Sequence, residues 1–251
     1  MPRAKMQLCW QGRQVKTRMA NLTGNERAQF VQGIFTRIAH RYDLMNRLMT
    51  VGQDVRWRKE VIRRAGLTRG GTLLDLGTGT GDLGLEAARQ QPGIEIVAVD
   101  FTVEMMHFGQ ARDEAGFLQW AAADTLYLPF PANMFDAVVS GFLLRNVSDI
   151  RQSLREQHRV LKPGGRIVCL DTTRPPKNLF SPVINFHLHT VIPVFGRVIS
   201  GDPDAYRYLP DSTEAFLAAE QLAGRMLSAG FREVGFNRRM LATVAIHWGI
   251  K

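Results

Sequence analysis

The chain has 251 residues, of which 45% are hydrophobic, and 32 Lys and Arg against 23 Asp and Glu give it a net charge of +9. This composition excludes a mainly disordered or collagen-like chain, and two widely spaced cysteines favour a reducing, cytoplasmic location over a disulfide framework. The charge is uneven: residues 1–64 carry 14 Lys and Arg and 4 Asp and Glu, a net of +10, and the remainder carries 18 and 19, a net of −1. A basic N-terminal section on a neutral body argues against binding of nucleic acid.

The N-terminal quarter is expected to hold a basic arm followed by helices. The first twenty residues include five basic side chains and no acidic one, so we expect residues 1–25 to form a disordered arm. From residue 26 to 65 apolar side chains recur at helical spacing, with a break near Thr50 and Gly52. No apolar run reaches the ~18 residues that a membrane span needs. The most apolar stretch, 179–199, is interrupted by polar residues and prolines.

Strands and helices alternate through the middle of the chain. Buried strands are expected at 72–78, 94–100, 117–121, 135–142 and 166–171. Helices are expected at 82–90, at 102–112 with Thr102 as N-cap, and at 150–161. This alternation predicts a doubly wound, Rossmann-like α/β sheet with right-handed crossovers.

The chain is expected to close with a helix at 213–229, capped by Gly230, and two strands at 231–238 and 241–247. Two strands separated by so few residues must pair antiparallel. A parallel sheet that ends in an antiparallel hairpin is typical of class I AdoMet-dependent methyltransferases and unusual for dinucleotide-binding dehydrogenases.

A glycine-rich segment follows the first expected strand and opens the next helix. Asp75 is followed by Gly77, Gly79, Thr80 and Gly81, and glycines at such a turn let the backbone approach a ligand closely. The segment also satisfies G-x-G-x-x-G through Gly84, so on its own it fits a dinucleotide as well as AdoMet.

Three acidic residues bear on the cofactor: Asp100 supports an adenosine ligand without choosing between NAD and AdoMet, whereas Asp75 and Asp124 narrow the choice. Asp100 ends the second strand, where a carboxylate accepts from a ribose diol, and Asp124 and Thr125 follow the third strand, where an acid can accept from an adenine amino group. Asp75 lies inside a hydrophobic strand, where a lone charge is costly, and a cofactor with a sulfonium and an α-amino group explains it. Together with the hairpin, these features favour AdoMet.

Five segments spread over nearly the whole chain carry a resemblance to a known family: YDLMNRLMTVGQDVRWRK, LDLGTGTGDL, LPFPANMFDAVVSGFLLRNVSD, RVLKPGGRIVCLD and DAYRYLPDS. On these segments the chain resembles the ubiquinone/menaquinone biosynthesis C-methyltransferases, a branch of the class I AdoMet-dependent enzymes. The glycine loop and KPGG are common to many methyltransferases, whereas the segments at 42–59, the LRN at 144–146 and the YRYL at 206–209 are specific to this branch.

The resemblance implies cofactor contacts at Thr80, Asp100, Asp124 and Thr125, and a further one near Gly141. The sequence departs from the family on the expected substrate side: LDTT at 170–173 replaces Leu-Glu-Phe-Ser, Leu143 replaces Gly, and Leu217 replaces Pro.

The implied reaction moves a methyl group from the AdoMet sulfonium to a ring carbon of a polyprenylated quinol. A phenol has a pKa of about 10, so the site must help a ring hydroxyl to lose its proton. We expect Arg145 and Asn146 to face the quinol oxygens and Tyr42, Asn46 and Tyr206 to close the pocket. No metal is expected.

The resemblance also implies a division of the chain: a helical cap at 26–66, an AdoMet-binding core at 72–171, a substrate cover at 172–212 and a C-terminal helix and hairpin at 213–251, all in one methyltransferase domain. The expected partners are a lipid quinol, the inner face of a membrane and a second copy of the chain, but no nucleic acid. Three alternatives stay open: another small-molecule methyltransferase, an RNA methyltransferase, and a non-catalytic AdoMet-binding subunit.

Overall fold

The computed structural model describes residues 24–175, 182, 184, 190 and 212–251. Its centre is a seven-stranded sheet with the strand order β3-β2-β1-β4-β5-β7-β6. All pairs are parallel except those of β7, which runs antiparallel to both β5 and β6. The strands are β1 Thr72–Leu76, β2 Glu95–Asp100, β3 Leu118–Ala122, β4 Phe135–Gly141, β5 Leu161–Thr172, β6 Arg232–Arg239 and β7 Val244–Ile250. The predicted doubly wound sheet with an antiparallel hairpin is therefore confirmed.

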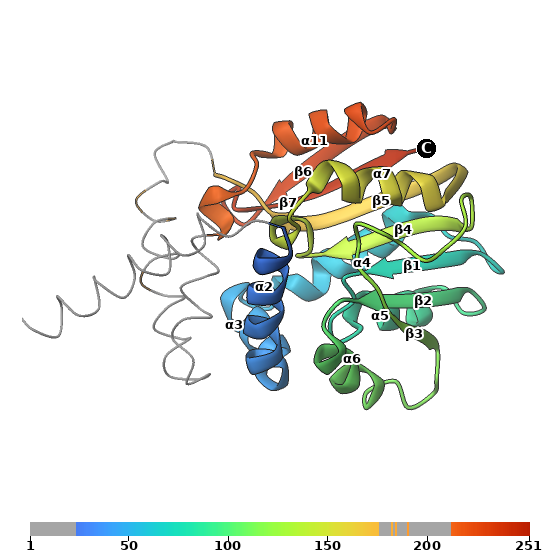
Figure 1. Ribbon diagram of the computed structural model, residues 1–251, viewed down its shortest axis with the longest axis horizontal. Coiled ribbons are helices and arrows are strands. Elements are labelled where there is room, and N and C mark those ends of the chain that lie inside the picture. The colour runs from blue at the N-terminus through green and yellow to red at the C-terminus, as the bar shows by residue number, and fades with distance from the viewer. Residues whose placement is uncertain (1–23, 176–181, 183, 185–189, 191–211) are drawn as a thin grey trace, which may run out of the picture.

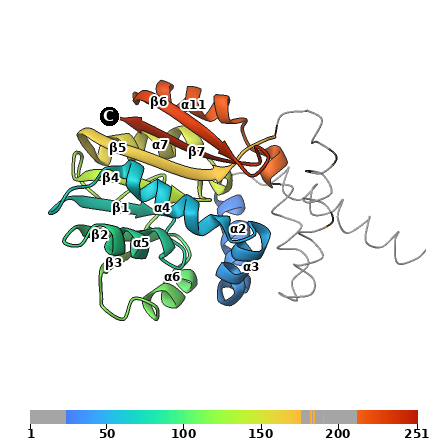
Figure 2. The same ribbon diagram turned by 180° about the vertical axis from the view of Figure 1, so that it is seen from behind.

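Helices cover both faces of the sheet. Figure 1 shows α7 (Ile150–Val160) and α11 (Ala219–Ser228) on one face, and Figure 2 shows α4 (Gln53–Ala65) and α5 (Asp82–Gln90) on the other. Helix α6 (Val103–Gln110) packs against β2 and β3 at the edge of the sheet.

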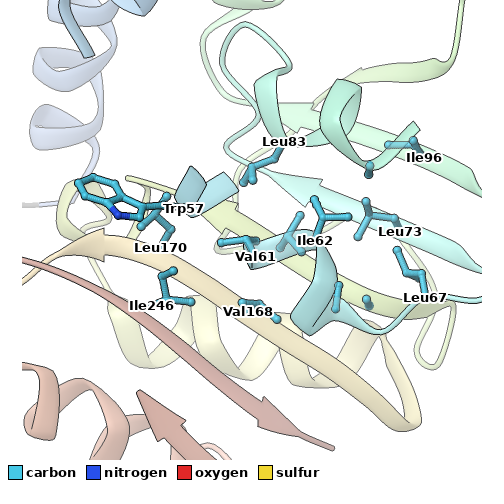
Figure 3. Packing of buried hydrophobic residues seen from close by; sticks show 14 of the residues in the cluster. Trp57, Val61, Ile62, Leu67, Leu73, Leu83, Ile96, Val168, Leu170 and Ile246 are labelled. Atoms are coloured by element: carbon cyan, nitrogen blue, oxygen red, sulfur yellow. The ribbon is translucent and has the colours of Figure 1, made fainter. Parts of the chain in front are cut away.

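The apolar character of the strands follows from this arrangement, because both faces of the sheet are buried. Leu73 on β1 packs with Val61 of α4, whereas the next residue, Leu74, belongs to the cluster that includes Leu154 of α7. Figure 3 shows the first of these clusters, with Trp57, Val61 and Ile62 of α4 lying on strand residues from β1 to β7. A strand buried on both faces reads as a continuous apolar run, as the sequence does here.

The N-terminal helices stand at the end of the sheet toward which the parallel strands point (Figure 1). They are α2 (Gly24–Ile38), a 3-10 turn (Ala39–Arg41) and α3 (Tyr42–Met49), and they are followed by α4. The predicted break near Thr50 and Gly52 is present: Val51 and Gly52 adopt positive φ of 53° and 71°, and the Thr50 hydroxyl bonds to Asp54. This turn redirects the chain from the end of the sheet to its face.

The expected helix at 213–229 is interrupted. Residues 212–215 are helical, but α11 begins only at Ala219, because the carbonyl of Leu217 accepts from the Arg174 amide and from the Thr173 hydroxyl at the end of β5. The prediction of one continuous helix was therefore wrong. Thr102 does precede α6, but its hydroxyl makes no capping bond; instead the Asp100 carboxylate accepts from the Thr102 amide at 2.7 Å.

Within the described residues, no helix is both long enough and apolar enough to span a membrane.

Candidate active site

A cavity opens at the carboxyl ends of β1, β2 and β4, beneath α2. Strand order reverses at β1, and ligands of open α/β sheets bind at such a switch point. The described residues that line the cavity come from the cap, from the glycine turn and from the segments that follow β2, β3 and β4: Gly24, Val31, Gln32, Phe35, Tyr42, Leu76, Gly77, Asp100, Phe101, Thr102, Met105, Ala123, Asp124, Thr125, Leu126, Gly141, Phe142, Leu143, Asn146, Val147 and Ser148.

The glycine turn shapes one end of the cavity. The amides of Gly77 and Thr78 both donate to the carbonyl of Val99, which pins the turn to β2. Gly77 has φ +68°, and a Cβ there would lie 2.7 Å from Leu143 Cδ1. A side chain at position 77 is therefore excluded both by the backbone conformation and by lack of space. Gly79, Thr80 and Gly81 continue the turn but do not themselves line the cavity.

Replacing Gly77 with Ala should weaken AdoMet binding by at least about tenfold, because left-handed strain of roughly 1–2 kcal/mol and displacement of Leu143 both distort the turn. Gly116→Ala is the matched control, since Gly116 has φ +63° with no atom within 4 Å of its would-be Cβ. Calorimetric titration should show weaker binding only for the Gly77 variant, and partial recovery when Leu143→Ala is added. Equal affinity in both glycine variants would contradict the assignment.

Asp75 is fully buried beneath this turn. Its Oδ2 accepts from the Thr78 hydroxyl at 2.7 Å and from the Gly84 amide at 2.9 Å, whereas its Oδ1 has no hydrogen-bond partner in the described part of the chain. Burial raises the pKa of Asp75 to about 7, and the two hydrogen bonds only partly oppose this. Asp75 thus connects the glycine turn to the start of α5 through hydrogen bonds, and its Oδ1 remains an unsatisfied acceptor beneath the turn.

Asp100 reaches the cavity from the end of β2. Its two oxygens accept from the amides of Gly79 and Thr102 at 2.8 and 2.7 Å, which fixes the carboxylate in place. Burial raises the pKa of this carboxyl, and those amide bonds oppose the effect. Each carboxylate oxygen has a second lone pair, so Asp100 can still accept from a diol.

Asp124, Thr125 and Gly141 line the same cavity. Asp124 Oδ1 accepts from the Leu126 amide at 2.9 Å, and the Thr125 hydroxyl is hydrogen-bonded to the Ser153 hydroxyl of α7 at 2.7 Å. The Thr125 hydroxyl is thus held by α7, and it keeps a further hydrogen-bonding site for a ligand.

Arg145 does not line this cavity. Its guanidinium pairs with Asp171 of β5 at 2.8 Å, both side chains are almost fully buried, and the Arg145 amide also donates to Asp171. The guanidinium lies 5.1 Å from the centre of the Phe142 ring. Arg145 lines an adjacent pocket, and the two pockets share Val147 and Ser148 as a wall. Asp171, the acidic residue of the LDTT segment at 170–173, is therefore the counter-ion of Arg145.

Of the other residues expected around the substrate, Asn146 and Tyr42 line the cavity. Asn146 donates to the Phe142 carbonyl at 3.0 Å, and Tyr42 packs edge-on against Phe35. Burial raises the pKa of the Tyr42 hydroxyl, opposed first by the Arg145 guanidinium and then by Asn46. Asn46 is buried beside Tyr42 but does not line the cavity.

Tyr206 and most of the expected substrate cover lie outside the described residues. Within the cover, Ile184 is buried and packs against Met49 of α3.

Sequence reasoning missed two residues that hold the site together, Asp43 and Arg112. Asp43 accepts from both the Thr80 hydroxyl and Arg112. Asp43 stands in the YDLMN segment, but nothing in the local pattern indicates that it reaches a turn 37 positions away.

These features together define an AdoMet-dependent methyltransferase. The glycine turn provides a cradle that side chains would fill, Asp100 offers acceptors for a ribose, and the orphaned oxygen of Asp75 suits a cationic ligand. No three His, Cys, Asp or Glu side chains of the described ranges come together in a way that could hold a metal ion.

The chain belongs to the ubiE/COQ5 methyltransferase family, whose model matches residues 22–251. It is 46% identical over 221 residues to the ubiquinone/menaquinone biosynthesis C-methyltransferase UbiE of Desulfotalea psychrophila, covering 88% of this chain and 90% of that protein. It is 44% identical over 218 residues to the demethylmenaquinone methyltransferase of Thermus thermophilus, covering 86% of this chain and 99% of that protein.

Solved structures share the fold at low sequence identity. The [4+2]-cyclase SpnF matches with a TM-score of 0.65 and 18% identity, over 91% of this chain and 96% of its own. A SAM-dependent methyltransferase from Aquifex aeolicus matches with a TM-score of 0.56 and 19% identity, over 77% of this chain and 88% of its own. The family match and the near-full-length relatives show that the protein is an AdoMet-dependent C-methyltransferase, with AdoMet as its cofactor.

Proposed function

We propose that the enzyme methylates a ring carbon of a polyprenylated quinol in respiratory quinone biosynthesis, with demethylmenaquinol as the first candidate acceptor. The observation that carries the proposal is near-full-length identity of 44–46% to relatives named for this chemistry. Both names include a menaquinone step, whereas only one includes ubiquinone, so the naphthoquinol is the acceptor common to both.

The wall of the cavity supports a flat, apolar acceptor with polar edges. Phe35, Phe142 and Leu143 supply apolar surface. Tyr42 and Asn146 supply polar groups and contact Phe35 and Phe142 respectively. When bound, AdoMet supplies an electrophilic methyl group. The remaining task of the protein is to orient the ring and to exclude water, which can account for much of the rate.

A ring carbon becomes nucleophilic when the neighbouring hydroxyl loses its proton, and the charge of Arg145 is placed to favour that loss. Its guanidinium is buried and lowers the pKa of the Tyr42 hydroxyl, while the paired Asp171 carboxylate offsets part of its field. Asp171 holds the guanidinium in orientation. Arg145 thus stabilises the phenolate form of the quinol, while Tyr42 and Asn146 position the quinol ring.

The direct test supplies the purified protein with labelled AdoMet and one acceptor at a time: demethylmenaquinol, a prenylated benzoquinol, or tRNA. Mass spectrometry then identifies the methylated product. We expect methylation of the demethylmenaquinol ring. Labelling of tRNA alone would overturn the proposal, and AdoMet binding without transfer to any acceptor would favour the non-catalytic alternative.

The division of the chain follows from this assignment. The cap at 26–66 and the core at 72–171 supply the described lining of the cavity except Gly24, which starts α2 two residues before the expected cap. The segments at 172–212 and 213–251 serve as substrate cover and as the closing helix and hairpin. Contact of Ile184 with Met49 supports a cover that lies next to the cap.

The cap is also the face proposed to rest on an anionic membrane surface. Leu44 and Val51 are 53% and 76% exposed, and the nearby side chains of Arg47 and Arg56 are exposed as well. Apolar groups flanked by basic ones suit the interface of an anionic bilayer, which stores the lipid substrate.

Changing both Leu44 and Val51 to Asp should reduce co-sedimentation with anionic liposomes several-fold, because each change removes apolar contact and adds repulsion. Leu227→Asp on α11, where Leu227 is 57% exposed, is the control. Equal sedimentation of all variants would show that the cap does not contact the membrane. Sedimentation velocity of the wild-type protein without liposomes determines whether it is a homo-oligomer.

A further inference from the structure

A network of charged side chains joins the cap to the glycine turn. Asp43 of α3 accepts from the Thr80 hydroxyl through Oδ1 and from Arg112 Nη1 through Oδ2, each at 2.7 Å. Arg112, just beyond α6, also donates to Asp82 Oδ1 at 2.7 Å and to the Thr80 carbonyl at 3.3 Å. Three separate elements therefore meet at Thr80.

Helix α4 supplies the remaining charged side chains of this network. Arg58 Nη2 lies 3.0 Å from Asp82 Oδ2, and Arg58 is hydrogen-bonded to the fully buried Asp54. Asp82 therefore has a cation on each oxygen, whereas Asp43 is the only group of this network that contacts the Thr80 hydroxyl. The arrangement gives Asp43 a distinct role from that of the other members.

The direction of the Asp43 hydrogen bond decides the polarity of Thr80. A hydroxyl has one hydrogen and two lone pairs, and an ionised carboxylate can only accept. Because the Thr80 hydrogen points to Asp43, the lone pairs of Thr80 Oγ1 remain as acceptors. A hydroxyl in this state binds an ammonium group and not a carboxylate.

We propose that Asp43 is a positioning residue for the cofactor, which makes Thr80 an acceptor for the α-ammonium group at the amino-acid end of AdoMet. Two observations agree with this polarity: Thr80 belongs to the turn whose first residue, Gly77, lines the cavity, and the unsatisfied Asp75 Oδ1 lies beneath the same turn. The inference rests on the proposed function and on AdoMet binding along this turn, although Thr80 itself is 3% exposed and does not line the cavity.

The variant Asp43→Asn tests the polarity, because Asn has nearly the same shape but its amide can donate to Thr80 Oγ1 and release the hydroxyl hydrogen. Calorimetric titration with three ligands distinguishes the ends of the cofactor: AdoMet and S-adenosylhomocysteine carry the α-amino acid, and 5′-methylthioadenosine lacks it. We expect about tenfold weaker binding of the first two and unchanged binding of the third, as for a weakened hydrogen bond to a charged group.

Asp136→Asn is the matched control, because Asp136 forms its ion pair with Lys162 at the opposite end of the sheet. A second variant, Thr80→Val, tests whether Asp43 acts through Thr80. In that background Asp43→Asn should have little further effect on AdoMet affinity.

Equal weakening of all three ligands would assign Asp43 a merely structural role, and unchanged AdoMet affinity would overturn the proposal. Additive effects of the two substitutions would also overturn it. Failure of the proposed function is distinguishable, since the wild-type protein would then bind AdoMet but leave the quinol unmethylated.

Discussion

Replacing Asp171 with Leu should lower the free energy of unfolding by about 3–5 kcal/mol, because it removes the carboxylate that balances a buried guanidinium. The side chains of Arg145 and Asp171 are 3% and 1% exposed, so water cannot take over this role. Asp171 also accepts from the amides of Arg145 and Thr172, which would lose their acceptor. Urea unfolding followed by circular dichroism measures the loss.

The double variant Arg145→Met, Asp171→Leu separates stability from catalysis. Replacing a buried ion pair by apolar side chains of similar volume is often neutral, so we expect stability within about 1–2 kcal/mol of wild type. AdoMet affinity should also persist, since neither residue lines the cofactor cavity. Methylation should be lost, because the buried positive charge is gone. A folded double variant with wild-type turnover would show that Arg145 serves only the ion pair.

The stability of the wild-type protein relative to Asp75→Asn should fall by about 3 kcal/mol between pH 5 and pH 8. The carboxyl of Asp75 has a pKa of about 7 in the folded protein, against an ordinary value of 3.8. Between these values the folded protein holds a proton that the unfolded chain releases, so rising pH favours unfolding. Above about pH 8 both states are ionised and the difference stays constant.

Urea unfolding of both proteins at a series of pH values provides the measurement. Taking the difference between wild type and variant cancels carboxyls that titrate in the opposite sense, such as Asp136 and Glu156, whose pKa values are lowered by Lys162 and Arg159 respectively. AdoMet affinity should rise with pH through the same range in wild type and change less in the variant, since a cationic ligand favours the ionised carboxylate. A pH-independent difference in stability would mean that Asp75 is already ionised at pH 5.

Much of the fold could be predicted from the sequence because local patterns encode it. The apolar runs around Leu73, Val97 and Val138 are continuous because these strands are buried on both faces. The spacing of Gly77, Gly79 and Gly81 predicts a turn whose positive φ angles favour glycine. The antiparallel hairpin followed from two strands with too short a connection for a crossover. Where local pattern and long-range contact disagreed, as at Leu217, the prediction of a continuous helix was wrong.

What the sequence by itself determined is therefore the kind of sheet, the cofactor turn and the carboxylate at the end of β2. Only the tertiary structure decided which side chains meet: Arg145 with Asp171, Thr80 with Asp43, and Thr125 with Ser153. Periodicity reports which face of an element is buried, but it carries no information about partners 26 to 37 positions away. Those pairings depend on strand order and on where the cap packs, and both arise only when the whole chain is folded.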